Sequence, residues 1–194
     1  MTAPGAEAAS GKGAASALPD PDRAAAALFS FLDGTGARIV LAESCTGGLA
    51  SAALTGIPGS SRVLWGGIVS YTEEAKTAVL GIPQADLGRF GVVSVETAAA
   101  MARGALAASG AASGAAKGGA DFAAAVTGYA GPDAPGSEGG PGRVCFAWAS
   151  RDGALRTEER RFEGPRPAVR KAACARLLEG AFEFCTEERG GERY

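Results

Sequence analysis

The sequence predicts an α/β protein in which one sheet lies between two helical layers, a three-layer α/β/α sandwich. Short apolar runs alternate along the chain with longer stretches of helical periodicity. Two glycine-rich corners, "ESCTGG" and "TGYAGPD", each follow an apolar run, and ligands of open α/β sheets bind at such corners. The length of 194 residues suits one well-cored domain. We therefore expect a single domain over residues 21–188, preceded by a disordered Ala/Gly-rich tail (1–20) and followed by a flexible C-terminus (189–194).

The first half of the domain is expected to alternate helices and strands. A helix from Pro21 ends at "DGTG", the strand "ARIVLA" follows, and a second helix runs from Thr46 to "TGIPG". "RVLWGGIVSY" is expected to be a strand, and its glycine pair indicates a bulge or a close backbone approach. "TEEAKTAVLGI" begins with a Thr N-cap and acidic residues, which predicts a helix, and a short helix should follow Pro83.

The second half is expected to complete the sheet and its cover. Ser94 is the expected N-cap of a helix in "GVVSVETAAAMARGALAA", and residues 109–119 are expected to form a mobile loop or a frayed helix end. "DFAAAVTG" reads as a strand that enters a long Gly/Pro loop, and residues 143–162 read as a hairpin. The last helix, from about Pro165 to Glu187, should bury one apolar stripe: Val169, Ala173, Leu177, Ala181 and Phe184.

The composition excludes several classes of function. The formal net charge is only −2 and the basic residues are scattered, so no nucleic-acid partner is expected. No apolar stretch approaches the roughly 18 residues of a membrane span, and the N-terminus lacks a secretory pattern, so we expect a cytoplasmic protein without a membrane partner. Four distant cysteines without a CxxC pair argue against a metal site, and no cofactor is expected.

The absence of histidine restricts the chemistry most, because it removes the usual general base. Proton transfer is left to Lys, Tyr, Cys, Asp or Glu. If Ser44 is a nucleophile, the candidate base is a lysine, and Lys76 follows a strand whose end can lie beside the first corner. Burial would lower the pKa of this lysine from ~10.4 to roughly 7–8. Tyr71, at the end of the same strand, would relay the proton or hold Lys76 in place.

Simpler interpretations of the same residues stay open at this point. Ser44 or Thr46 would then cap a helix, Lys76 would be a solvated helix lysine, and Tyr71 would be a tyrosine at the edge of the core. Cys45 is a rival nucleophile on the same corner. The other three cysteines are interpreted as small core residues.

Six stretches together resemble one protein family over roughly residues 22–186. "AESCTGGLASAALTGIPGSS", "GGIVSYTEEAK", "LGI", "GVVSVETAAAMARGAL", "AVTGYAGPD" and "GPRPAVRKAA" occur in the order and near the spacings of the C-terminal domain family of CinA, the competence/damage-inducible protein. Stand-alone members of that family are nicotinamide-nucleotide amidohydrolases. The resemblance implies hydrolysis of the carboxamide of nicotinamide mononucleotide, giving nicotinate mononucleotide and ammonia, within pyridine nucleotide recycling.

The resemblance also implies roles for individual residues. Ser44 would be the nucleophile and Lys76 its base, with Tyr71 in the same catalytic group. We expect a homo-oligomer and a small nucleotide as the partner, as in relatives of the family. The residues that match substrate-side motifs are Glu43, Thr46, Gly47, Gly48, Gly59, Ser60, Ser61, Thr127, Gly128, Ala130, Gly131 and Arg166.

The chain departs from the family pattern at four positions. Glu73 stands where Asn is frequent, and Tyr129 stands where Ile is frequent. The family lysine of the third loop corresponds to Gly139, and Arg143 replaces a threonine. Two alternatives to the deamidase therefore remain: a nucleotide-binding or regulatory module whose altered loop no longer supports turnover, and a hydrolase of the same mechanism acting on another small amide or ester.

Overall fold

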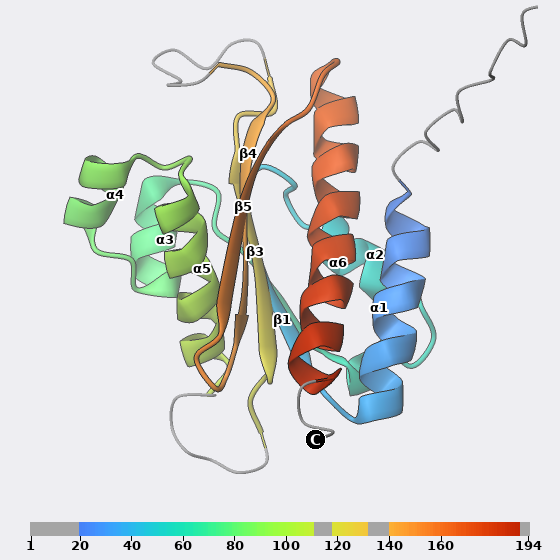
Figure 1. Cartoon of the computed structure of the whole chain (residues 1–194). Coiled ribbons are helices and arrows are strands. Elements are labelled where there is room, and N and C mark those ends of the chain that lie inside the picture. Colours follow the sequence, from blue (N-terminus) through green and yellow to red (C-terminus); the bar gives the residue numbers. More distant parts are fainter. Residues whose placement is uncertain (1–19, 111–117, 132–139, 191–194) are drawn as a thin grey trace, which may run out of the picture.

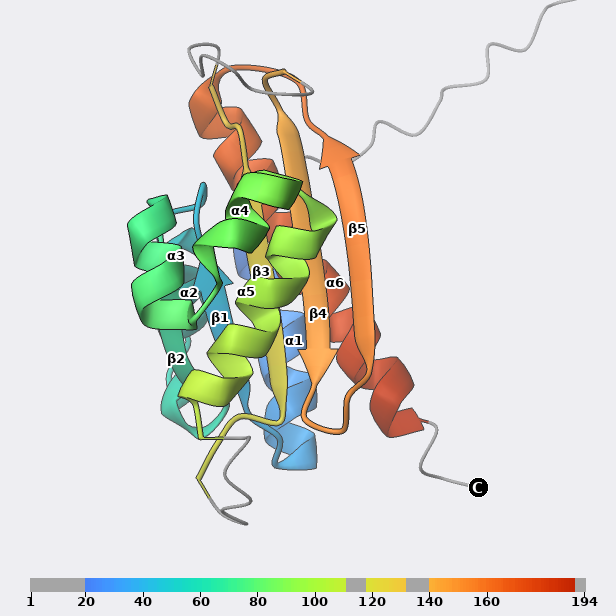
Figure 2. The ribbon, with the colours of Figure 1, turned by 90° about the vertical axis from the view of Figure 1, so that its left-hand side faces the viewer.

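The computed structural model describes residues 20–110, 118–131 and 140–190, which form one sheet between two helical layers (Figures 1 and 2). The strands are β1 (Ile39–Glu43), β2 (Leu64–Val69), β3 (Phe122–Gly128), β4 (Arg143–Ser150) and β5 (Leu155–Arg161). The helices are α1 (Pro21–Thr35), α2 (Leu49–Thr55), the 3-10 turn η1 (Ser60–Arg62), α3 (Glu73–Leu80), α4 (Gln84–Phe90), α5 (Val95–Ala108) and α6 (Arg166–Gly190). The predicted three-layer α/β class is confirmed.

The sheet has the strand order β2-β1-β3-β4-β5. Strand β1 pairs in parallel with both β2 and β3, whereas β4 and β5 continue the sheet in antiparallel fashion. The carboxyl ends of β1, β2 and β3 therefore meet at one edge. Open α/β sheets bind ligands at such an edge.

Two hydrophobic clusters fill the spaces on either side of the sheet. Helices α1, α2 and α6 pack on one face, and α3, α4 and α5 pack on the other (Figure 1). On the α6 side, the indole N–H of Trp148 donates to the Leu177 carbonyl at 3.0 Å, so this buried polar group is paired. Gly180 makes the close approach possible, because a Cβ there would lie 2.1 Å from the Trp148 ring.

Two predicted capping residues are confirmed, because the side chain of Thr72 caps α3 and that of Ser94 caps α5. The side chain of Asp20 caps α1, which was not predicted from the sequence. The predicted bulge in β2 is confirmed by a register shift opposite Ile39 and Val40. The predicted close approach is also confirmed, because a Cβ on Gly67 would lie 2.0 Å from the Ser51 hydroxyl.

The start of α2 differs from the prediction. The helix begins at Leu49, three residues later than expected, with Gly48 as its N-cap. Gly47 and Gly48 have φ angles of 63° and 95°, which lie in the left-handed region and interrupt a right-handed helix. Neither Ser44 nor Thr46 caps the helix, so the capping interpretation of these two hydroxyls is wrong.

Several expected segments fall wholly or partly outside the described residues. These are the N-terminal tail, most of the low-complexity stretch 109–119 and the third loop between residues 132 and 139. The last helix continues to Gly190, past the helix end expected at about Glu187. Within the described ranges, none of the helices is long and apolar enough to cross a membrane.

Candidate active site

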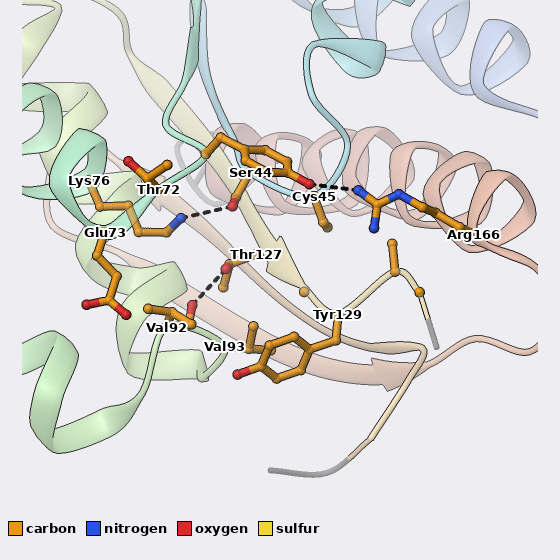
Figure 3. A pocket seen from close by; sticks show the side chains of 14 residues that line it. Ser44, Cys45, Thr72, Glu73, Lys76, Val92, Val93, Thr127, Tyr129 and Arg166 are labelled. Atoms are coloured by element: carbon orange, nitrogen blue, oxygen red, sulfur yellow. Dashed lines mark hydrogen bonds between the residues drawn. The ribbon is translucent and has the colours of Figure 1, made fainter. Parts of the chain in front are cut away.

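A pocket of about 410 Å³ opens at the carboxyl ends of the parallel strands (Figure 3). The corner after β1, the first turns of α3, the segment before α5 and the loop after β3 form its walls. It is lined by Ser44, Cys45, Tyr71, Thr72, Glu73, Lys76, Val92, Val93, Thr127, Gly128, Tyr129, Ala130, Gly131 and Arg166.

Ser44 and Lys76 meet on one wall of this pocket. The Lys76 ammonium donates to the Ser44 hydroxyl at 2.9 Å and to the Ser70 carbonyl at 2.8 Å. Only 2% of Lys76 is exposed, so the solvated-lysine interpretation is wrong. The parallel pairing of β1 with β2 brings the two residues together from positions 32 apart in the sequence.

The environment favours Ser44 over Cys45 as the nucleophile. Burial lowers the pKa of Lys76 from 10.5 to about 8, which leaves a neutral amine accessible near neutral pH. Burial also raises the pKa of the Cys45 thiol to about 12, so this side chain stays protonated and poorly nucleophilic. Cys145, Cys174 and Cys185 are buried free thiols, as predicted for core residues.

Glu43 fills the N-terminus of α2 from within the protein. Its fully buried carboxylate accepts the backbone N–H groups of Gly48, Ala50 and Ser51 at 2.8–3.2 Å, and the Ser51 hydroxyl at 2.6 Å. The resemblance implied that Gly48 would lie on the substrate side. Its N–H instead donates to Glu43, because the helix dipole favours a negative charge there.

The rest of the corner is held from the α6 side. Arg170 donates from Nε to the Cys45 carbonyl at 3.0 Å and from Nη2 to the Thr46 carbonyl at 2.7 Å. Thr46 is fully buried, and the N–H of Gly47 donates to the Ser44 carbonyl at 3.0 Å. Thr46, Gly47 and Gly48 therefore shape the corner from behind and do not line the pocket.

The opposite side of the pocket carries Arg166 at the start of α6. Its guanidinium donates to the Tyr71 hydroxyl at 2.7 Å, and a Cβ on Gly131 would lie 3.4 Å from it. The structure thus pairs Tyr71 with Arg166, whereas we expected it beside Lys76. Thr127 donates to the Val92 carbonyl at 2.7 Å, which ties the loop after β3 to the segment before α5.

Two of the departures from the family pattern lie in the pocket. Tyr129 faces Val93 across the lower wall, and Glu73 lies on the side away from Arg166 (Figure 3). Gln84 donates to the Glu73 carboxylate at 3.0 Å and holds it in place. Arg143 forms an ion pair with Glu159 on β5 and does not line the pocket.

The second expected substrate-side loop lies elsewhere. Gly59, Ser60 and Ser61 immediately precede β2, whose first residue Leu64 pairs with Ile39 at the start of β1. They therefore lie at the amino ends of the parallel strands, opposite the pocket. The reason is that α2 carries the chain back along β1 before the turn.

Sequence reasoning did not assign a role to several residues at the site. Arg170 had a usable signal, because it follows Arg166 by four positions and so lies on the same helix face. Val92 and Val93 had none, since their approach to Thr127 depends on how α5 packs over β3. Thr72 was predicted only as a helix cap.

Comparison with known proteins identifies relatives of the whole chain. The model of the CinA C-terminal domain matches residues 22–185. The nicotinamide-nucleotide amidohydrolase PncC of Pseudomonas putida is 44% identical over 153 residues, covering 78% of this chain and 88% of that protein. A CinA-like protein of Akkermansia muciniphila is 43% identical over 147 residues, and there the match covers 76% of this chain but only 33% of the longer relative.

Solved structures of CinA-type proteins share the fold of this chain. A competence/damage inducible protein from Agrobacterium tumefaciens superposes with a TM-score of 0.77 at 36% identity, covering 88% of this chain and 99% of that one. A CinA superfamily protein from Klebsiella pneumoniae superposes with a TM-score of 0.78 at 32% identity, covering 87% and 99%.

Proposed function

The chain belongs to the CinA C-terminal domain family, and we propose that it hydrolyses the carboxamide of nicotinamide mononucleotide to nicotinate mononucleotide and ammonia. The relative from Pseudomonas putida carries the name of this activity at 44% identity. The observation that carries the proposal is the buried contact of 2.9 Å between Lys76 and Ser44 in the pocket.

In the first step, Ser44 attacks the carboxamide carbon. The neutral Lys76 amine takes the hydroxyl proton as the bond between Oγ and carbon forms, and the carbonyl electron pair moves onto oxygen. When the tetrahedral species collapses, the bond from carbon to nitrogen breaks. Lys76 then returns its proton to the leaving nitrogen, so ammonia departs and an ester on Ser44 remains.

In the second step, water hydrolyses this ester. Lys76 takes a proton from water, the hydroxide adds to the carbonyl carbon, and the bond to Ser44 Oγ breaks with return of the proton to the serine. The sum is one water consumed, with one nicotinate mononucleotide and one ammonia formed. This conversion suits pyridine nucleotide recycling, which we include in the proposal.

The polarity of the pocket supports a nucleotide substrate. Arg166, held by Tyr71, offers a guanidinium at one side for the 5′-phosphate, and Glu73 offers a carboxylate at the other for the cationic ring (Figure 3). Ser44 and Lys76, the proposed reactive pair, line the pocket together with these two residues. The catalytic role that the sequence assigned to Tyr71 becomes, in this proposal, the orientation of Arg166.

Ammonia release from nicotinamide mononucleotide by the wild-type protein and by Ser44→Ala tests the proposal. We expect turnover by the wild type and a loss of at least about 10³-fold in the variant, with unchanged thermal unfolding. The matched control is Cys45→Ala, which should retain turnover.

Other outcomes identify the alternatives. Binding of nicotinamide mononucleotide without ammonia release would favour the binding or regulatory module. Equal turnover of nicotinamide riboside, which lacks the phosphate, would favour a hydrolase of small amides in general. Loss of turnover in Cys45→Ala with retention in Ser44→Ala would transfer the nucleophilic role to the thiol.

A further inference from the structure

We infer that Arg170 is a positioning residue that sets the peptide planes after Ser44, so that the backbone N–H of Cys45, which lines the pocket, holds the oxyanion. The inference rests on the proposed function, because an oxyanion forms only when Ser44 attacks a carbonyl. It concerns a residue outside the pocket walls, which acts through the backbone and does not touch substrate.

The donors at the start of α2 are already occupied. Glu43 accepts the N–H groups of Gly48, Ala50 and Ser51, and the Ser44 carbonyl accepts that of Gly47. Within the described part of the chain, no backbone carbonyl accepts the N–H groups of Cys45 and Thr46. They belong to the two residues that directly follow the nucleophile, and Cys45 lines the pocket with Ser44. The N–H of the residue after a nucleophilic serine serves as an oxyanion donor in hydrolases with a comparable strand-to-helix corner.

Arg170 fixes the direction of the Thr46 N–H directly. Because a peptide unit is planar and trans, the Cys45 carbonyl and the Thr46 N–H point in opposite directions from one plane. Arg170 Nε binds that carbonyl at 3.0 Å on the α6 side. The N–H of Thr46 must therefore point away from α6.

Arg170 fixes the direction of the Cys45 N–H through one further link. Its Nη2 binds the Thr46 carbonyl at 2.7 Å, which sets the plane that contains the Gly47 N–H. That N–H donates to the Ser44 carbonyl at 3.0 Å, and the Ser44 carbonyl shares its plane with the Cys45 N–H. One guanidinium thus sets the direction of both N–H groups.

The contact is built into the corner. A Cβ on Gly47 would lie 3.1 Å from Arg170 Nη2, so glycine leaves room for the guanidinium, and its φ of 63° suits glycine as well. Arg170 follows Arg166 by one helical turn, so the first turns of α6 serve both the substrate side and the corner. In the described residues Arg170 forms no ion pair with a carboxylate. Its positive charge also acts at Cys45, where it opposes the rise of the thiol pKa.

Steady-state kinetics of Arg170→Ala with nicotinamide mononucleotide test the inference. We expect kcat to fall roughly 10- to 100-fold, since loss of an oxyanion donor costs about 10²–10³. KM should stay within about threefold, because the residue does not contact substrate in the ground state. A non-denaturing concentration of guanidinium chloride should restore part of kcat, and the same concentration of sodium chloride should not. Lys171→Ala, an exposed neighbour on α6, is the matched control and should behave as wild type.

The outcomes separate positioning from a structural role. A kcat equal to that of Lys171→Ala, or a loss carried by KM alone, would overturn the inference. If Arg170→Ala does not fold, Arg170→Lys keeps the charge and one donor, and it should show a reduced kcat with an unchanged KM. If Arg170→Lys has the kcat of the wild type, one donor is enough, and the proposed need for contacts to both the Cys45 and the Thr46 carbonyl is wrong.

A second substrate distinguishes this inference from the proposed function. Acetylation of Ser44 by p-nitrophenyl acetate also passes through an oxyanion. Its rate is the wild-type rate of acetylation minus the rate that remains in Ser44→Ala. If the wild type releases no ammonia but Arg170→Ala slows this acetylation, the proposed function fails and the inference stands. If the wild type releases ammonia and Arg170→Ala is acetylated at the wild-type rate, the inference fails alone.

Discussion

At the scale of single residues, Lys76 combines two properties that oppose each other. It is almost fully buried, which penalises its charged form, and it contacts the Ser44 hydroxyl, which loses a proton in the proposed mechanism. An amine with an ordinary pKa would be charged at neutral pH and unable to accept that proton. Burial therefore makes Lys76 suitable as a base and at the same time costs the protein stability.

The pH dependence of turnover follows from this pKa. Lys76 must be neutral to act as a base, so kcat/KM should rise with pH and level off above about 8. Burial has the largest effect and lowers the pKa of Lys76, whereas the negative charge of Glu73 favours the protonated amine and raises this pKa. In Glu73→Gln the rising limb should move to lower pH, by up to roughly one pH unit. Its control is Glu74→Gln, an exposed neighbour; a shift of the limb to higher pH would contradict the assignment of Lys76 as base.

The cost of the buried amine predicts a stability change. The pKa of Lys76 is about 8 in the folded protein and ordinarily 10.5, so below pH 8 the folded state carries a penalty of about 3 kcal/mol. Lys76→Met removes this penalty but leaves the Ser70 carbonyl without its donor, at a cost of about 1 kcal/mol. We expect a net rise in the free energy of unfolding on the order of 1–2 kcal/mol at pH 7.

The same linkage fixes how this gain varies with pH. Both states hold a neutral amine above pH 10.5, so the advantage of Lys76→Met should shrink between pH 8 and 10.5. Denaturant unfolding at pH 7 and pH 10 measures it, with the exposed Lys171→Met as control. A variant less stable than wild type at pH 7 would show that the contacts of Lys76 outweigh its desolvation.

At the scale of elements, helix α2 and strand β1 are joined through one carboxylate. Helix α2 has only seven residues, and no side chain of its own N-cap satisfies its first N–H groups. Glu43, the last residue of β1, does so instead. The strand-to-helix corner that carries Ser44 is thus held by Glu43, which binds N–H groups at the start of α2, and by Arg170, which binds two carbonyls of the corner.

Removal of this charge should loosen the corner. In Glu43→Gln an amide nitrogen faces a backbone N–H donor, so at least one contact is lost and another becomes repulsive. We expect the free energy of unfolding to fall by about 1–3 kcal/mol, together with a lower kcat. The control is Glu96→Gln, because Glu96 is an exposed acidic residue in the first turn of α5, and this change should alter stability by less than about 0.5 kcal/mol. Equal effects of the two variants would show that Glu43 acts only as a general helix-dipole charge.

The elements were predictable where their signals are local. Thr72 and Ser94 act through hydrogen bonds within one turn, and sequence patterns record such contacts. The start of α2 was misplaced because its cap comes from Glu43, which lies in the preceding strand. The partner of Tyr71 was missed for a related reason, since Arg166 is 95 positions away.

At the scale of the whole molecule, the sheet order determines which predicted residues meet. The pairing of β1 with both β2 and β3 brings Ser44, Lys76 and Thr127 to one pocket. The same topology leaves Gly59, Ser60 and Ser61 at the far end of the strands. Alternation of helices and strands predicts the three-layer class, but it does not specify strand order, so motif matching could not separate these two groups.

We propose for the molecule as a whole that Ser44, activated by Lys76, hydrolyses the carboxamide of nicotinamide mononucleotide. The most direct measurement is ammonia release from this nucleotide by the wild type beside Lys76→Met, a variant expected to fold more stably. We predict one ammonia per nucleotide consumed by the wild type, and at least about a 10³-fold lower rate in the variant. A folded Lys76→Met with turnover near that of the wild type would contradict the claim.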